Sequence, residues 1–263
     1  MLKPLVTIPM YLGESGDVEV VLETVRSVRK TVSDSVDILL VDDHSPAQEL
    51  VDQIAPGLAR LDAELHRKPE NTGFSKTVNV GLKRALEEGR DAVLMNADIE
   101  MHTPGWVRTC QKTKDSKDRP AAVVGALLLY PNGLIQHGGI YFSLLTRAFD
   151  HMYKYGPGNL PEALVPSVRP VTGAFQYIRR EALELVGVYD EDFFMAHEDV
   201  DYCIRIFLSG LQCIYQPKVR AFHFEMMFRG RPSPKVQEWQ QKSWLHFTNK
   251  WATQNFGGLV PFI

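Results

Sequence analysis

Buried apolar runs alternate with amphipathic segments from residue 5 to residue 98, and this alternation constrains the fold more than any other feature. The run LVTIPMY at 5–11 precedes residues 18–32, where valine and leucine recur at helical spacing. Residues 37–46, DILLVDDHSP, and 91–98, DAVLMNAD, are further continuous apolar runs of the kind buried in parallel sheets. The pattern predicts an α/β fold, a Rossmann-like and mostly parallel central sheet flanked by helices, with ligands at the carboxyl ends of the strands.

The size and composition of the chain are those of one globular α/β unit. It has 263 residues, of which 44% are hydrophobic and 23% charged, so disorder is not expected as a bulk property. A formal net charge of −3 argues against binding nucleic acid by charge alone. The three cysteines show no paired spacing, so neither a disulfide framework nor a zinc site is predicted, and reduced thiols are expected.

Targeting and membrane segments are not predicted. The amino terminus lacks a charged stretch followed by a long apolar one, so no signal peptide is expected. No segment approaches the roughly 18 apolar residues that a transmembrane helix needs. The sequence therefore predicts a cytoplasmic protein, either free or peripheral at a membrane.

The alternation of apolar runs and amphipathic segments ends after residue 117. The segments around Asn132-Gly133 resemble a hairpin, and the Gly/Pro-rich residues 155–170 are interpreted as a lid or an acceptor rim. Residues 168–187 are predicted as a strand and a helix, and residues 211–225 as two short strands. The last amphipathic segment, 236–252, carries three of the four tryptophans, and core packing of a terminal helix is favoured over an interface role.

The polar residues at the strand ends indicate what such a sheet would bind. No GxGxxG follows the first strand, and no GxxxxGK[ST] occurs, which counts against a dinucleotide enzyme and a P-loop NTPase. Polar clusters instead follow three strands, at residues 42–45, 71–73 and 96–98. Carboxylates without a basic cradle predict a divalent cation, Mn²⁺ or Mg²⁺, on a nucleotide diphosphate.

Seven motifs, taken in order, resemble those of family 2 glycosyltransferases of the GT-A fold, in the rhamnosyltransferase-like branch. They are VTIPMY, VDDHSP, ENTGFSKTVNVGLKRA, LMNADIE, TGAFQYIRREALELVGVYDEDFF, HEDVDYCIR and RAFHFE. The resemblance runs from about residue 4 to residue 225. It implies a glycosyltransferase domain over 1–225, with a nucleotide-binding half at 1–117 and an acceptor and catalytic half at 118–225. Residues 226–263 would form a loop and a helical extension.

The resemblance implies a metal-dependent, inverting transfer of a sugar from a UDP- or dTDP-sugar to an acceptor hydroxyl, in glycan or polysaccharide biosynthesis. The residues expected to contact the nucleotide come from the ends of the first four predicted strands and the helix at 74–89; they are Pro9, Tyr11, Glu14, Asp42, Asn71, Gly73, Lys76, Asn79 and Asn96. Asp42 is expected to bond the base, and Asp43 to serve as a turn or ribose contact. For Lys76, helix-surface polarity is an equal alternative.

The metal is expected at the family's DxD position, which reads Asn96-Ala97-Asp98 here. Asp98 is the predicted ligand together with His223, although a lone strand histidine is often structural. The substitution of the first aspartate by Asn96 puts a ribose or metal contact there in doubt. Glu225, Arg229 and Arg231 are expected to close over the diphosphate or to form a solvated charged loop.

The acidic segment HEDVDYCIR supplies the catalytic prediction. By the resemblance, Asp199 is the general base that takes the acceptor's proton, with Glu198 as the alternative base or an orienting partner. Asp201 is expected to form an ion pair with Arg205 on the helix surface. Gly173 and Ala174 are expected to leave room for the donor sugar or the acceptor, or else to pack tightly.

Two other functions remain open at this stage. In a non-catalytic nucleotide-sugar-binding module, Asn96 would reflect the loss of a catalytic motif, because it replaces the first aspartate of the family's DxD sequence. A sugar nucleotidyltransferase shares the architecture, but its first loop is rich in glycine and arginine, and TIPMYLGESGD has no arginine. The acceptor is expected to be a glycan, a lipid-linked saccharide or a small molecule, and the carboxyl-terminal helix is expected to serve acceptor choice or homo-oligomer formation.

Overall fold

The computed structural model describes residues 2–32, 35–118, 120–225 and 234–253. Its centre is a ten-stranded sheet with the main order β10-β12-β6-β11-β4-β1-β2-β3. The first half is parallel and consists of β1 (Leu5–Met10), β2 (Asp37–Asp42), β3 (Ala63–Arg67) and β4 (Ala92–Met95). The central sheet flanked by helices is therefore confirmed.

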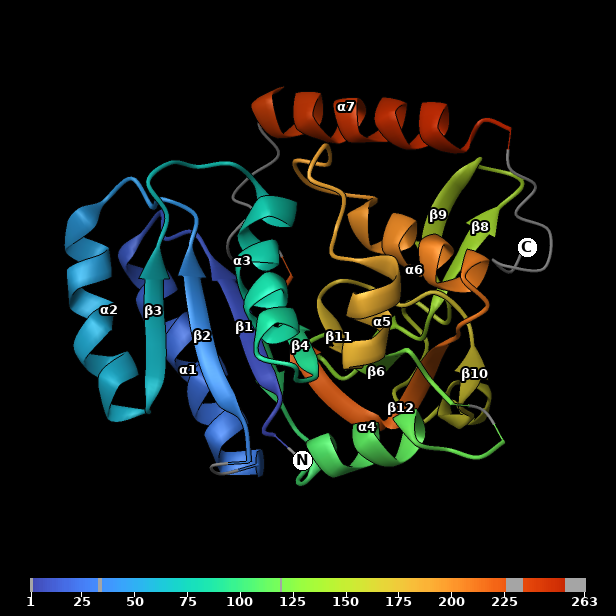
Figure 1. The fold of residues 1–263 in the computed structure, drawn as a ribbon, viewed down its shortest axis with the longest axis horizontal. Helices are drawn as coiled ribbons and strands as arrows, with labels where there is room; N and C mark the ends of the chain where they lie inside the picture. Colours follow the sequence, from blue (N-terminus) through green and yellow to red (C-terminus); the bar gives the residue numbers. More distant parts are fainter. Residues whose placement is uncertain (1, 33–34, 119, 226–233, 254–263) are drawn as a thin grey trace.

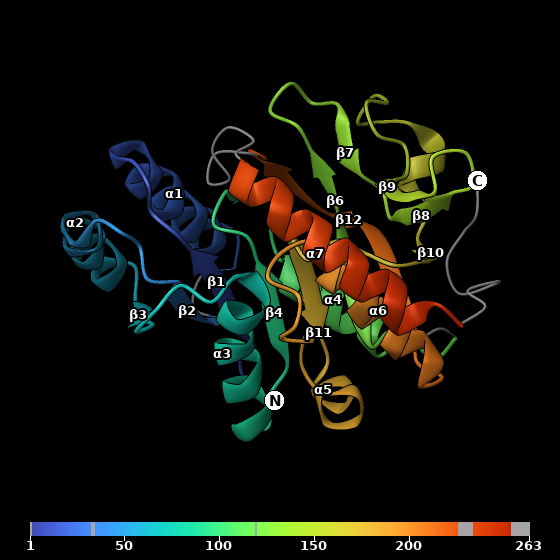
Figure 2. The same cartoon turned by 90° about the horizontal axis from the view of Figure 1, so that it is seen from above.

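The apolar strands of this half are buried on both faces, which is why they read as continuous runs. Along β2, Ile38 and Leu40 face one hydrophobic core while Leu39 and Val41 face the other. The first core is covered by α1 (Ser15–Val32), α2 (Gln48–Arg60) and α4 (Trp106–Lys114), and the second by α3 (Phe74–Glu87), α5 (Arg180–Val186) and α6 (Glu198–Leu208). Figure 2 shows α1 and α3 on opposite sides of the strands.

Antiparallel pairs gather in the second half of the sheet. There β11 (Phe175–Ile178) runs antiparallel between β4 and β6 (Val123–Leu129), and β12 (Cys213–His223) runs parallel to β6. The edge strands are β5 (Ile99–Met101), β7 (Ile135–His137) and β10 (Ser167–Val168). Because β11 joins β4, residues 1–117 and 118–225 share one sheet, and their division by function stays a prediction.

Three predictions for this half have clear outcomes. The hairpin around Asn132-Gly133 is confirmed, because β6 and β7 pair and the Gly133 N–H bonds the Tyr130 carbonyl at 2.8 Å. The prediction of two strands at 211–225 was wrong: β12 is one strand whose register with β6 shifts between Gln216 and Arg220. Helix α4 and strand β5 were not predicted from the sequence.

Two peripheral elements complete the described chain. A separate hairpin of β8 (Ile140–Ser143) and β9 (Ala148–His151) packs beside α6 and α7 (Pro234–Trp251) through a third apolar cluster, which includes Phe193, Phe247 and Trp251. Figure 1 shows α7 across the end of the molecule toward which the arrows of β1, β2 and β3 point. The helical extension is thus present, and it lies over the carboxyl ends of the strands.

The segment 155–170 forms no lid over these strand ends. It contains the short 3₁₀ helix Pro161–Leu164 and β10. It packs along the sheet edge, where the Tyr215 hydroxyl donates to the Ala163 carbonyl at 2.8 Å. None of its residues is among those that line the large cavity of the described chain, so the interpretation as a lid or acceptor rim was wrong.

Candidate active site

A cavity of about 720 Å³ opens at the carboxyl ends of β1 and β4. Its walls come from segments far apart in the sequence: the loops after these two strands, the start of α3, the β7–β9 region, residues 172–174, residues 194–200, the end of β12 and the first turns of α7. A cavity is therefore present at the carboxyl ends of the strands, where the sequence predicted that a ligand binds. α7 contributes Lys235, Val236 and Trp239 to the wall.

Five of the nine predicted nucleotide-contact residues line this cavity. They are Pro9, Tyr11, Asn71, Gly73 and Asn96. Gly73 has a φ of +89°, and an added Cβ would lie 2.5 Å from the carbonyl oxygen of Phe194, so this position requires glycine. The close approach joins the loop before α3 to the loop before α6.

Asp42 is not among the residues that line the cavity. Its carboxylate is fully buried, accepts the Ser45 N–H at 3.0 Å and the Ser45 hydroxyl, and lies 3.4 Å from Arg67. The neighbouring Asp43 lines the cavity instead and accepts the backbone N–H groups of Thr72 and Gly73 at 3.0 and 2.9 Å. Consecutive side chains along a strand point to opposite sides, which explains why Asp43 and not Asp42 lines the cavity.

The other three predicted nucleotide residues also lie away from the lining. Glu14 is exposed before α1, and Lys76 is exposed on α3. The amide of Asn79 is buried, donating to the Tyr189 carbonyl at 2.8 Å and accepting the Tyr189 N–H at 3.0 Å. Asn79 therefore ties α3 to the segment that leads into α6, which is a structural role.

Asn96, Asp98 and His223 converge on one side of the cavity. The Nδ1 of His223 lies 2.6 Å from the Gln136 Oε1, which can only accept, so Nδ1 carries the proton and Nε2 the lone pair. Nε2 lies 3.2 Å from the Asp98 Oδ1 and 3.3 Å from the Asn96 amide nitrogen. The Asn96 Oδ1 is buried and has no hydrogen-bond partner among the described residues.

This donor set fits a divalent cation. The Asp98 carboxylate oxygen lies next to the Nε2 lone pair of His223, and Asn96 adds a buried amide whose oxygen has no partner among the described residues; oxygen and imidazole ligands of this kind suit Mn²⁺ or Mg²⁺. Gln136 was not predicted, yet it fixes the tautomer of His223, as residues behind a metal-binding histidine commonly do. Its amide also donates to the His223 carbonyl and to Glu225, at 3.3 and 3.2 Å.

The predicted base, Asp199, stands at the first turn of α6 and lines the cavity. Its Oδ2 accepts the Gly173 N–H at 2.9 Å, and its Oδ1 accepts the Val200 N–H at 2.8 Å. Ala196 and His197, just before α6, have left-handed φ values of 70° and 68°. Such a backbone is uncommon outside glycine, and here it leads directly into the first turn of α6.

The remaining predicted residues of this wall lie beside Asp199. Glu198 is buried and lines the cavity, as do Gly173 and Ala174. An added Cβ on Gly173 would lie 3.3 Å from the Cβ of Asp199, so any larger residue here would require a shift of a few tenths of an ångström in the neighbouring side chain. The predicted Arg229 and Arg231 lie outside the described residues.

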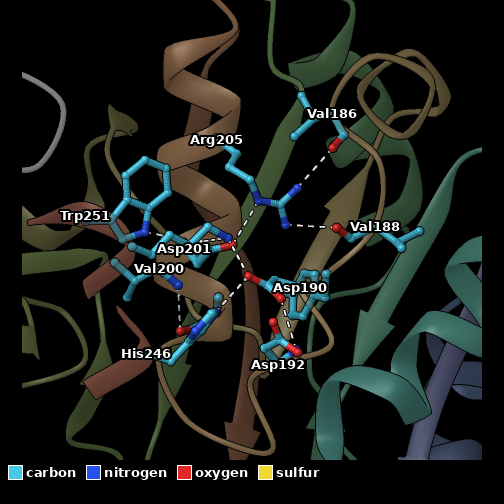
Figure 3. A network of polar contacts seen from close by, with 12 residues as sticks. Val186, Val188, Asp190, Asp192, Val200, Asp201, Arg205, His246 and Trp251 are labelled. Carbon is cyan, nitrogen blue, oxygen red and sulfur yellow. Dashed lines mark hydrogen bonds and ion pairs between the residues drawn. The ribbon is translucent and has the colours of Figure 1, made fainter. Parts of the chain in front are cut away.

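Asp201 forms the predicted pair with Arg205 at 2.9 Å, but its location at the helix surface was wrong. Asp201 is fully buried and also contacts the Trp251 Nε1 at 3.1 Å and the Lys250 Nζ at 2.8 Å (Figure 3). The burial follows from α7, which covers this face of α6. The pair is therefore part of the contact between two helices.

Asp190 makes the matching contact from the loop before α6 (Figure 3). It accepts from the Lys250 Nζ at 2.5 Å and from the His246 Nε2 at 3.0 Å. Burial would raise the pKa of Asp190, but these bonds and one from the Asp192 N–H outweigh it and hold the pKa well below its usual range. Asp190, Asp192 and His246 lie close enough to share a metal, yet Lys250 already supplies positive charge there.

Comparison with known proteins adds family information to this geometry. A family model described as "Glycosyl transferase family 2" matches residues 6–187. An O-antigen biosynthesis protein of Myxococcus xanthus is 28% identical over 77% of this chain. An N-acetylglucosaminyl-diphospho-decaprenol L-rhamnosyltransferase of Mycobacterium tuberculosis is 28% identical over 61% of it. The matches span 16% and 58% of the lengths of these relatives.

A solved structure carries the same fold. The crystal structure of GalNAc-T7 with UDP, GalNAc and Mn²⁺ superposes with a TM-score of 0.65, covering 84% of this chain and 44% of that one. Its sequence identity of 19% makes this a statement about the fold alone. None of the described helices is long and apolar enough to cross a membrane.

Proposed function

This chain belongs to glycosyltransferase family 2, with rhamnosyltransferase-like relatives, and on that premise we propose that it transfers a sugar from a nucleotide diphosphate donor to an acceptor hydroxyl. The reaction we propose inverts the anomeric carbon. One observation carries the proposal: Asp199 and the group formed by Asn96, Asp98 and His223 face the same cavity. A base and a metal site on one cavity are what such a displacement needs.

Asp199 is the proposed general base. Its two backbone N–H bonds fix the carboxylate in the cavity wall, where it would take the proton of the acceptor hydroxyl as that oxygen attacks. General base catalysis of this kind contributes roughly 10²–10⁴ in rate. Glu198 is the proposed orienting partner or alternative base.

Asp98 and His223 are the proposed metal ligands, and Asn96 the third. A divalent cation bound there would neutralise the charge that develops on the leaving diphosphate. Gln136 would hold His223 with its Nε2 lone pair toward the metal, because its own carbonyl oxygen takes the Nδ1 proton. The exchange of aspartate for Asn96 removes one charge but keeps an oxygen ligand.

The nucleotide would lie between the ends of β1 and β4 and the loop before α3. Pro9, Tyr11 and Asn71 are the proposed contacts to the nucleoside, and Gly73 allows close backbone approach. Asp43 replaces Asp42 in this proposal, because only Asp43 is among the lining residues. Its carboxylate would face the base or the ribose while holding the N–H groups of Thr72 and Gly73.

The donor is proposed to be a UDP- or dTDP-sugar, and a rhamnosyl donor is the first to test because a relative is named for rhamnosyl transfer. The name of the Myxococcus relative supports a role in glycan or polysaccharide biosynthesis. The acceptor would be a glycan, a lipid-linked saccharide or a small molecule. A cytoplasmic location, free or peripheral at a membrane, stays part of this proposal.

A donor panel tests the function. Purified protein with Mn²⁺ would be incubated with UDP-, dTDP- and GDP-sugars, with and without candidate acceptors, and released nucleotide diphosphate measured. We expect metal-dependent release from one donor, reduced at least a hundredfold in Asp199→Asn and in Asp98→Ala. Asp52→Asn, an exposed change on α2, is the matched control and should leave the rate unchanged.

The same panel separates the alternatives. Donor binding without release in the presence of every acceptor would favour a non-catalytic module. Formation of a sugar nucleotide from a sugar phosphate, with pyrophosphate as the second product, would favour a nucleotidyltransferase. Equal rates in wild type and Asp199→Asn would contradict the assignment of the base.

A further inference from the structure

Two imidazoles in the cavity wall, His137 and His151, hydrogen-bond to each other directly. Their Nδ1 atoms are 2.6 Å apart. His137 ends β7 and is 1% exposed, whereas His151 ends β9 and is half-buried. Both line the cavity, and none of the steps proposed above uses either side chain.

The hydrogen bonds of the pair fix both tautomers. The backbone N–H of Thr172 donates to the Nε2 of His137 at 3.4 Å, so that nitrogen carries a lone pair and the proton of His137 is on Nδ1. The Nδ1 of His137 then donates to the Nδ1 of His151, which must accept. The proton of His151 is therefore on Nε2, and both rings are neutral.

The surroundings agree with a neutral pair. Burial lowers the pKa of both imidazoles, and the carboxylates of Asp199 and Asp150 offset this only in part for His151. His151 and the proposed base Asp199 line the same cavity. The pair touches the same loop as that base, because Thr172 bonds His137 and Gly173 bonds Asp199.

The Nε2–H of His151 has no acceptor in the part of the chain that the structure describes. A neutral N–H donor that lines a cavity beside a base suits an uncharged oxygen such as a sugar hydroxyl. We propose that His151 is a saccharide-binding residue whose Nε2–H donates to a hydroxyl oxygen of the reacting sugar, with His137 as the positioning residue that fixes its tautomer. This inference rests on the proposed function.

Nuclear magnetic resonance tests the tautomers without any substrate. Protein carrying ¹⁵N-labelled histidine would be studied by long-range ¹H–¹⁵N correlation at neutral pH, with His151→Leu and His137→Gln used to assign the two rings. We expect the Nδ1–H form for His137 and the Nε2–H form for His151. A proton on the Nδ1 of His151, or a charged ring in either residue, would overturn the proposal.

Kinetics tests the saccharide contact. With the donor that the panel identifies, His151→Leu should lower kcat/KM about tenfold, the loss expected for one hydrogen bond. His151→Gln, which keeps an N–H donor near the same position, should restore most of it. His66→Leu, on the exposed face of the edge strand β3, is the control and should leave the rate unchanged.

Whether the donor KM or the acceptor KM rises in His151→Leu identifies which substrate carries the hydroxyl that His151 contacts. A hydroxyl of the donor would give a raised donor KM and slower hydrolysis of the donor without acceptor. A hydroxyl of the acceptor would give a raised acceptor KM alone. Unchanged constants for both substrates in His151→Leu would overturn the proposal, whereas a wild type that turns over no donor would instead contradict the proposed function and leave the tautomer result standing.

Discussion

At the residue scale, two consecutive side chains of β7 contact two different parts of the cavity wall. Gln136 accepts the Nδ1 proton of His223 on the metal side, and His137 contacts the loop that holds Asp199 on the base side. Alternation along a strand sends neighbouring side chains in opposite directions. A three-residue edge strand thus orients both halves of the proposed chemistry.

Replacing Gln136 should weaken metal binding without touching a ligand. In Gln136→Leu nothing would fix the His223 tautomer, and Mn²⁺ affinity should fall about 10- to 100-fold. Electron paramagnetic resonance titration of Mn²⁺ in the presence of a nucleotide diphosphate measures this. Gln53→Leu, an exposed change on α2, should bind as the wild type does, and an unchanged affinity in Gln136→Leu would contradict the orienting role.

Adding a methyl group at Gly173 should disturb the base. The new Cβ would lie 3.3 Å from the Asp199 Cβ and 3.4 Å from the Tyr189 hydroxyl, so one neighbour must move by a few tenths of an ångström. Gly173→Ala should therefore lower kcat about tenfold with little change in donor KM, since misplacement of a reacting group is costly. Steady-state kinetics tests this against Gly16→Ala, where no atom lies within 4 Å.

At the element scale, α7 is held by buried charge as well as by apolar contacts. Asp201 on α6 and Asp190 in the preceding loop both pair with Lys250 near the end of α7. At the other end of the helix, Trp239 stacks on Phe194 with ring centroids 4.2 Å apart. α7 is therefore fixed at both ends while its first turns border the cavity.

Acid should weaken this docking through Asp190. A folded-state pKa below the unfolded value of ~3.9 adds stability above that pH and loses it as the pH falls toward the folded value. We expect the urea midpoint of the wild type to exceed that of Asp190→Asn at pH 6 and the difference to shrink between about pH 4 and pH 3. Asp192→Asn is the exposed control, and a pH-independent difference would contradict the mechanism.

At the scale of the whole molecule, the cavity joins residues from both ends of the chain. Pro9 lies near the end of the first strand and Trp239 belongs to the last described helix, yet both line it. A ligand that fills this space would therefore bridge the parallel half of the sheet, the mixed half and α7. Binding should stabilise the folded chain as one unit.

Melting experiments test that linkage. A nucleotide diphosphate with Mn²⁺ at about 100 times its Kd should add about 2.7 kcal/mol of stability, which raises Tm by roughly 5–10 °C in a chain of this size. The shift should require both components and disappear in Asp98→Ala. A shift of equal size in Asp98→Ala would contradict the metal site.

The sequence alone predicted the strands and helices of the parallel half and the end of the sheet at which the cavity lies. Apolar runs such as 37–41 predict buried strands because a continuous run excludes a solvated face, and the polar residues that follow must lie at the strand ends. Asn71, Gly73 and Asp98 line the cavity for that reason. The family motifs then supplied roles that spacing alone could not.

Only the tertiary structure decided which polar groups face the cavity and which face another element. Asp42 and Asp43 are adjacent, but Asp42 bonds Ser45 and Arg67 away from the cavity, whereas Asp43 lines the cavity and forms an ion pair with Lys68 at 2.6 Å. Asp201 is buried only because α7 packs over α6, and the His137–His151 bond joins two strands across 14 residues. Such contacts depend on how separate helices and strands pack against each other. The hydrophobic pattern within one element does not indicate which residue of another element it will contact.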